Sequence, residues 1–131
     1  PLIAHIGSLD DVSRLAVDIP EAFYVLADAF WPGPLTIVLK KHSDVPALVS
    51  AGHPTIAIRM PAHPLALRLI QAAGEPLVAP SANLSGRPSP TQASDVKEDL
   101  TDRIHFILDG GESSIGIEST VISLIGPVPI L

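Results

Sequence analysis

Apolar runs of strand length alternate along this chain with amphipathic stretches of helix length. The apolar runs predict strands at 2–6, 35–39, 55–60, 76–79, 104–108 and 119–124, with the start of another at 128–131. The amphipathic stretches predict helices over about 8–18, 21–30, 63–73 and 91–100, with a short helical turn over 45–50. Some links, such as the one from 108 to 119, carry no helix. The pattern therefore predicts an α/β fold in which helices flank a mixed sheet with at least one antiparallel pair.

Local signals set the expected ends of these helices. Ser8 followed three residues later by Asp11 is an N-terminal capping pattern. Gly74 is expected to end its helix in the left-handed conformation that glycine adopts without steric cost. Thr91 or Ser94 is expected to cap the last helix, which is short and acidic.

The predicted strand 55–60 has two chemically different faces. Successive side chains alternate across a strand, so Thr55, Ala57 and Arg59 share one face, while the apolar side chains at positions 56, 58 and 60 share the other. A small residue between a hydroxyl and a guanidinium is suited to lining a ligand cleft. A solvent-facing edge with a surface arginine is the alternative interpretation.

A loop of small polar residues follows the predicted strand 76–79. Residues 80–91 are rich in Ser, Asn, Gly and Pro, which favour turns. In open α/β sheets, ligands bind in the crevice beyond the carboxyl ends of the strands. The loop is therefore either a binding loop or an ordinary connection to the helix that Thr91 caps.

Composition limits the classes of function. The 131 residues fit a single domain over 1–131, or part of one. With 14 acidic against 8 basic residues, the net charge is −6 and the basic residues are scattered, which argues against an extended nucleic-acid surface. A small anionic ligand needs only one or two arginines and some backbone donors.

Other sequence features bear on location and completeness. No apolar run approaches the ~20 residues that span a bilayer, and no secretory signal pattern is present. The absence of cysteine fits a cytoplasmic protein. Both ends of the chain lie in apolar runs, and we expect it to be a piece of a longer protein, truncated at both ends.

Familiar catalytic motifs are absent. The sequence has no Gly-x-x-x-x-Gly-Lys loop, no Gly-x-Gly-x-x-Gly and no Gly-x-Ser-x-Gly. The five histidines show no paired ligand spacing, so no metal site is expected. His5 lies within an apolar run and needs a polar partner when buried, which is compatible with a core histidine or a ligand contact.

Four ordered motifs resemble those of the YrdC-like family, the threonylcarbamoyl-adenylate synthases. They are Pro-Leu-Ile-Ala-His-Ile at 1–6, Trp-Pro-Gly-Pro-Leu-Thr at 31–36, Ser-Ala-Asn-Leu-Ser-Gly at 81–86 with Ser-Pro-Thr at 89–91, and Gly-Ile-Glu-Ser-Thr-Val at 116–121. Residues 58–64 also match, so the resemblance covers nearly the whole chain. It implies an open, twisted mixed sheet flanked by helices, with a ligand cleft.

The resemblance also implies a reaction and a set of partners. L-threonine, bicarbonate and ATP, with Mg²⁺ accompanying ATP, would give threonylcarbamoyl-AMP and pyrophosphate for modification of tRNA by downstream proteins. Such chemistry needs alignment and charge stabilisation rather than a protein nucleophile, so no catalytic residue is assigned. Two alternatives remain: an RNA-binding module without turnover, and a carbamoyltransfer domain of the hydrogenase-maturation type.

Residues matching the family motifs take roles by resemblance. His5, Arg59, Ala79 and Ser119 would form the threonine pocket, with Arg59 binding the carboxylate. Thr55, Ser81, Asn83 and Ser89 would contact ATP.

The sequence also departs from the family pattern. The Lys-x-Arg motif that binds triphosphate and an arginine expected after the last strand have no counterpart in this sequence. The form of the motif at 116–121 resembles the longer, two-domain members. We therefore expect the 131-residue chain alone to be inactive.

Overall fold

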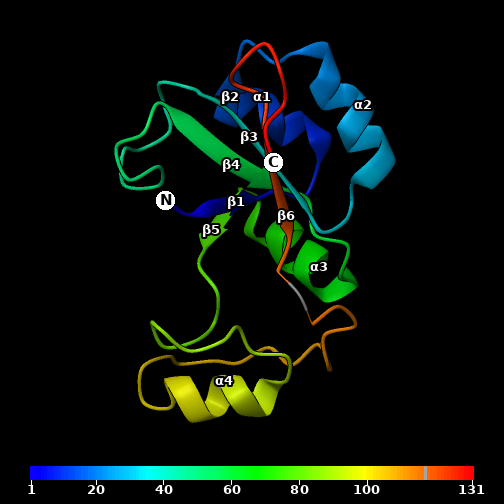
Figure 1. Ribbon diagram of the computed structural model, residues 1–131. Helices are drawn as coiled ribbons and strands as arrows, with labels where there is room; N and C mark the ends of the chain where they lie inside the picture. The colour runs from blue at the N-terminus through cyan, green and yellow to red at the C-terminus, as the bar shows by residue number, and fades with distance from the viewer. Residues whose placement is uncertain (117) are drawn as a thin grey trace. The chain divides into compact units, whose positions relative to one another are not determined.

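A computed structural model of the chain describes residues 1–116 and 118–131, which divide into two units (Figure 1). Unit 1 comprises Pro1–Ala79 together with Ser119–Leu131, and unit 2 comprises Pro80–Glu118. The single-domain interpretation stays a prediction. Among the described residues, no helix is both long and apolar enough to cross a membrane.

Unit 1 contains a six-stranded sheet that mixes parallel and antiparallel pairs, and the mixed character is as the sequence predicts. Its strands are β1 (Ile3–His5), β2 (Ala16–Val17), β3 (Leu35–Lys41), β4 (Thr55–Arg59), β5 (Leu77–Ala79) and β6 (Thr120–Ser123). The order is β2-β3-β4-β1-β5, and β6 also pairs with β3. Parallel pairing joins β1 to β4 and β3 to β6, whereas the pairs β2–β3, β3–β4 and β1–β5 are antiparallel.

The helices of unit 1 begin and end mostly where local chemistry predicts. They are η1 (Leu9–Asp11), α1 (Val12–Leu15), α2 (Glu21–Phe30) and α3 (Pro64–Ala73). Ser8 and Asp11 form the expected capping box. Gly74 ends α3 with a φ of 72°, also as expected. His63 caps the start of α3, where its Nδ1 accepts a hydrogen bond from Leu65 N at 3.2 Å.

The core of unit 1 lies between the central strands and α2. Ile37, Leu39, Ile56 and Ile58 are fully buried, and side chains of α2 join the same cluster. The Trp31 ring meets the Phe23 ring edge to face with centroids 5.5 Å apart, and its Nε1 donates to the Leu35 carbonyl at 2.7 Å. Trp31 therefore anchors the core, with its ring packed and its single N–H donor satisfied.

One short segment of unit 1 differs from the sequence prediction. The helix predicted over 8–18 ends at Leu15, because Ala16 and Val17 instead pair with Lys41 and Lys40 of β3. At these two residues, the hydrogen bonds of the sheet override a weak local preference. The short helical turn predicted over 45–50 agrees with the turns found there, in which Val49 N donates to the Pro46 carbonyl at 3.1 Å.

Unit 2 contains one helix, α4 (Ala93–Leu100), among its described residues. Its N-cap is Gln92, so capping by Thr91 or Ser94 is a wrong prediction. The Asp95 carboxylate accepts hydrogen bonds from the backbone N–H groups of Gln92 and Thr91 at 3.1 and 3.2 Å. This carboxylate satisfies N–H groups that the helix itself leaves unpaired.

The strand predicted over 104–108 does not form. These residues pair with no described strand, and Phe106 and Leu108 are 93% and 60% exposed. A strand exists only through hydrogen bonds to a neighbouring strand, so an apolar pattern of strand length is not sufficient by itself.

Candidate functional site

In unit 1, His5 and Arg59 are register partners on the parallel strands β1 and β4. Directly opposed residues point to the same face of a sheet, so their side chains share one face. Alternation along β4 adds Thr55 and Ala57 to that face, each half-buried, as the sequence predicts. Ala79 belongs to the same face, because it lies opposite Ile3 of β1.

The guanidinium of Arg59 is half-buried and lacks an acidic partner among the residues that the structure describes. Its Nε donates a hydrogen bond to the Gly33 carbonyl at 3.0 Å. Burial lowers the pKa of Arg59 from its ordinary value, although an arginine stays protonated in proteins. A desolvated cation without a counter-charge favours an anionic ligand.

His5 contributes no second positive charge at neutral pH. Its burial, together with the nearby charge of Arg59, lowers the pKa of His5 below the ordinary 6.5. Hydrogen bonding to the backbone of Leu77 and Ile3 acts in the opposite direction, but less strongly. The neutral imidazole can donate from one nitrogen and accept at the other.

Gly33 holds a turn against the end of β4. Its N–H donates to the Met60 carbonyl at 2.8 Å, and its own carbonyl accepts from Arg59. A Cβ at Gly33 would lie 2.2 Å from the Phe30 carbonyl oxygen, which is too close for any side chain. The turn therefore requires glycine at this position.

Ser119 enters the same face of the sheet just before β6. Its hydroxyl lies 3.3 Å from the hydroxyl of Thr36, which is fully buried on β3. Ser119 is among the predicted site residues, whereas Thr36 and Gly33 are not, although both lie in the motif at 31–36. Side chains alternate along the predicted strand 35–39, so Thr36 faces away from the apolar side chains of Leu35 and Ile37. This alternation could have indicated Thr36 as a candidate site residue.

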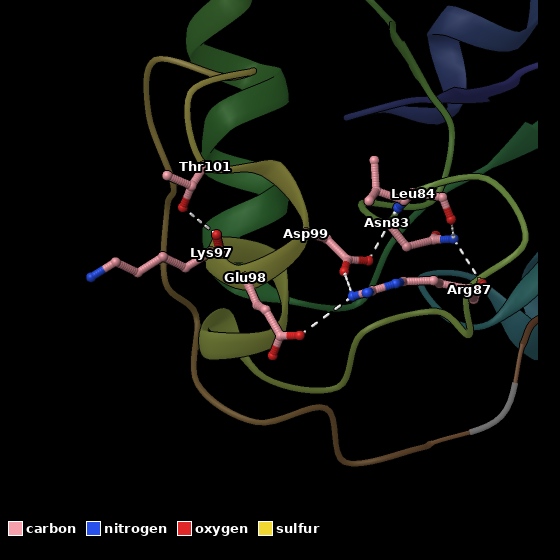
Figure 2. A network of polar contacts seen from close by, with 7 residues as sticks. All are labelled: Asn83, Leu84, Arg87, Lys97, Glu98, Asp99 and Thr101. Carbon is pink, nitrogen blue, oxygen red and sulfur yellow. Dashed lines mark hydrogen bonds and ion pairs between the residues drawn. The ribbon is translucent and has the colours of Figure 1, made fainter.

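Unit 2 carries the polar loop, and Asn83 organises it (Figure 2). The Nδ2 of Asn83 donates to the carbonyls of Leu84 and Arg87, each at 2.9 Å. Its Oδ1 is buried and has no hydrogen-bond partner among the described residues. The Nδ2 group therefore donates only within the loop, and Oδ1 accepts no hydrogen bond from the described residues.

Arg87 fixes this loop to α4. Its Nη1 pairs with the Asp99 carboxylate and lies 3.4 Å from Glu98 Oε1, while Asp99 also accepts from Leu84 N at 3.1 Å (Figure 2). The hydrogen bond with Asp99 and the charge of its carboxylate raise the pKa of Arg87 above its ordinary value. Arg87 is thus engaged with two carboxylates of α4.

The other two hydroxyls predicted for ATP also lie in unit 2. Ser81 lines a cavity of about 490 Å³ formed by the loop, α4 and the segment 104–113. The Ser89 hydroxyl donates to Glu118 Oε1 at 2.9 Å. No three His, Asp or Glu side chains within 1–116 and 118–131 are grouped so that they could hold a metal ion.

Unit 1 therefore brings together the residues predicted for the threonine pocket, His5, Arg59, Ala79 and Ser119, and it also carries Thr55. Unit 2 contains the rest of the set predicted for ATP, namely Ser81, Asn83 and Ser89.

Comparison with known proteins agrees with the motifs. A family model for Sua5, YciO and YrdC, described as telomere recombination, matches residues 1–131. The threonylcarbamoyl-AMP synthase of Pyrococcus abyssi is 53% identical over 131 residues, which are all of this chain and 38% of that protein. The Bacillus subtilis enzyme of the same name is 50% identical over 132 residues, again all of this chain and 38% of that protein.

A solved structure supports the fold. The crystal structure of Pyrococcus abyssi Sua5 complexed with L-threonine matches with a TM-score of 0.96 at 53% identity. The match covers 98% of this chain and 38% of that one. The chain thus spans well under half the length of the relatives that it matches.

Proposed function

We propose, given that this chain belongs to the Sua5, YciO and YrdC family, that it provides the threonine pocket and part of the nucleotide site of a threonylcarbamoyl-AMP synthase. The proposed reaction converts L-threonine, bicarbonate and ATP into threonylcarbamoyl-AMP, pyrophosphate and water. The product would then pass to proteins that modify tRNA. The name shared by the relatives from Pyrococcus abyssi and Bacillus subtilis supports this proposal.

The half-buried Arg59 is the observation that carries the proposal. With Nε bonded to the Gly33 carbonyl, the edge formed by its two Nη groups remains for a ligand. That edge matches the two oxygens of a carboxylate and binds them in a bidentate fork. The charge of Arg59 therefore selects the carboxylate end of an amino acid.

The neighbouring groups fit the rest of a small amino acid. A neutral His5 does not repel the threonine amine, which must lose its proton before it can react with bicarbonate. Ala57 and Ala79 place only small side chains on this face of the sheet, and the Ser119 hydroxyl would supply a polar contact. These features favour a short polar side chain over a long apolar one.

In the proposed reaction, the threonine carbamate attacks the α-phosphorus of ATP, and the bond to pyrophosphate breaks. The protein mainly aligns the reactants and stabilises charge. Thr55, Ser81, Asn83 and Ser89 are proposed to contact ATP through hydroxyl and amide groups. Since the described residues group no metal ligands, we propose that Mg²⁺ arrives bound to the phosphates of ATP as part of the substrate.

We further propose that the 131-residue chain is inactive by itself. Arg87, the cation of the loop predicted to contact ATP, already pairs with Asp99 and Glu98. The charge that develops on the phosphates therefore needs other cations. Losing one preorganised stabilising group typically costs on the order of 10²–10³ in rate.

Calorimetry and a pyrophosphate-release assay test the proposal. The complete gene product should bind L-threonine and release pyrophosphate only when threonine, bicarbonate and ATP are all present. The 131-residue chain should release none. D-threonine serves as the control ligand, since it reverses the positions of amine and side chain. Absence of L-threonine binding, or pyrophosphate release independent of threonine, would contradict the function.

A further inference from the structure

Thr36 is a polar residue in a position where a purely structural strand would place an apolar one. Its exposure is 0%, between the buried apolar residues Leu35 and Ile37 of β3. A buried hydroxyl without a hydrogen-bond partner is costly, so Thr36 needs one. Among the described residues, its side chain has the Ser119 hydroxyl at 3.3 Å.

The sheet register places Thr36 between the two polar groups of the proposed threonine pocket. Ile37 lies opposite Ile58 on the antiparallel strand β4, and continuing that register by one residue brings Thr36 opposite Arg59. On its other side, β3 runs parallel to β6, where Leu35 lies opposite Thr120. The register partner of Thr36 on β6 is Val121, and Ser119, which directly precedes β6, reaches Thr36 diagonally from the side away from Arg59, with the two hydroxyls 3.3 Å apart.

Ser119 itself lies outside the strand. The hydrogen bonds of the sheet begin with Thr120, so the ladder does not fix the Ser119 side chain. A serine hydroxyl otherwise rotates among its staggered positions. The contact with Thr36 selects one of these positions before any ligand binds.

We infer that Thr36 is a positioning residue for amino-acid recognition, which holds the Ser119 hydroxyl in the orientation that the ligand contacts. This inference rests on the proposed function. If Thr36 donates the shared hydrogen bond, the Ser119 proton is directed to the ligand. If Ser119 donates, its lone pairs face a ligand donor such as the amine. In both cases, the pocket is preorganised, and less rotational freedom is lost on binding.

Two substitutions at Thr36 separate the hydroxyl from its packing. Thr36→Val keeps the shape and removes the hydroxyl, whereas Thr36→Ser keeps the hydroxyl and removes a methyl group. In the complete gene product, we expect Thr36→Val to raise the Kd for L-threonine by about three- to tenfold, the usual effect of one hydrogen bond. Thr36→Ser should retain the affinity within about twofold, even if it lowers the melting temperature.

A role in packing alone predicts the reverse order. Thr36→Val would then keep the affinity, and Thr36→Ser would lose stability and affinity together. Thr120→Val is the matched control, because Thr120 is exposed and follows Ser119 directly. Steady-state kinetics add a second readout: Thr36→Val should raise KM for threonine while KM for ATP stays unchanged.

A double-mutant cycle with Ser119→Ala tests whether Thr36 acts through Ser119. Once the Ser119 hydroxyl is gone, adding Thr36→Val should weaken binding by less than about twofold. A full additional loss in the double variant would overturn the inference, and so would unchanged affinity of Thr36→Val alone. If the unaltered protein fails to bind L-threonine, the proposed function falls and the inference with it. If it binds but Thr36→Val has no effect, only the inference falls.

Discussion

The Nε of Arg59 donates a hydrogen bond to the Gly33 carbonyl at 3.0 Å, which joins the end of β4 to a turn 26 residues earlier in the chain. This contact sets the plane of the guanidinium. It also leaves the edge with two Nη groups for a carboxylate. A side chain that is held by the backbone on one edge and open on the other is prepared for an anionic ligand before that ligand arrives.

Removing the guanidinium should weaken threonine binding specifically. In the complete gene product, Arg59→Ala should cost about 2–4 kcal/mol of binding free energy, because a bidentate contact in a desolvated site is lost. ATP affinity should change little. Calorimetry with each ligand measures both effects. The control is Arg68→Ala, which removes an exposed arginine from α3, and equal threonine affinity in the two variants would remove Arg59 from the pocket.

Lysine should not replace Arg59. Arg59→Lys keeps the positive charge but loses both the planar fork and the hydrogen bond from Nε to Gly33. We expect the Kd for threonine to rise about tenfold, since one charge-assisted hydrogen bond is lost. Binding as tight as in the unaltered protein would show that charge alone, without orientation by Gly33, is sufficient.

A side chain at Gly33 should destabilise the fold. Gly33→Ala would place a Cβ 2.2 Å from the Phe30 carbonyl oxygen, so the backbone must shift. A forced rearrangement of this kind costs about 1–3 kcal/mol of unfolding free energy. Urea denaturation followed by circular dichroism measures the loss. In the control Gly126→Ala, the new Cβ would have an ordinary contact of 3.8 Å with the Val128 carbonyl, and a loss there as large as for Gly33→Ala would contradict the steric explanation.

The polar loop should affect ATP more than threonine. Replacing Ser81 and Asn83 together by Ala should raise KM for ATP or lower kcat by roughly tenfold, which corresponds to loss of one or two hydrogen bonds. The far-ultraviolet circular dichroism spectrum should stay the same. Asn83 also donates to two carbonyls of its own loop, so a collapsed spectrum would show that the loop is mainly structural.

Acid should destabilise unit 1 through His5. Burial and the charge of Arg59 lower the pKa of His5 in the folded state below the ordinary 6.5. Between these two pKa values, the unfolded state binds more protons, so stability rises with pH and falls as pH drops below about 6.5. The difference in unfolding free energy between pH 7.5 and pH 5 should be smaller in His5→Gln. The exposed His53→Gln serves as the control, and an equal pH dependence in all three proteins would contradict this role of His5.

Local chemistry alone determined much of this protein. Pro20 and Trp31 flank α2, and Gly74 ends α3, where sequence reasoning placed these boundaries. Alternation along 55–60 correctly put Thr55 and Arg59 on one face, because the two-residue period of a strand is independent of its neighbours. The motifs also identified the family, since they depend only on the order and spacing of residues.

Only the tertiary structure decided the contacts between distant segments. Ser119 is 83 residues from Thr36, and no local pattern states which strands become neighbours. For the same reason, Ala16 and Val17 form a strand although the sequence pattern predicts a helix there. The segment 104–108, which the pattern predicts to be a strand, forms none. A helix satisfies its backbone hydrogen bonds within itself, but a strand and a site depend on partners that the sheet register supplies.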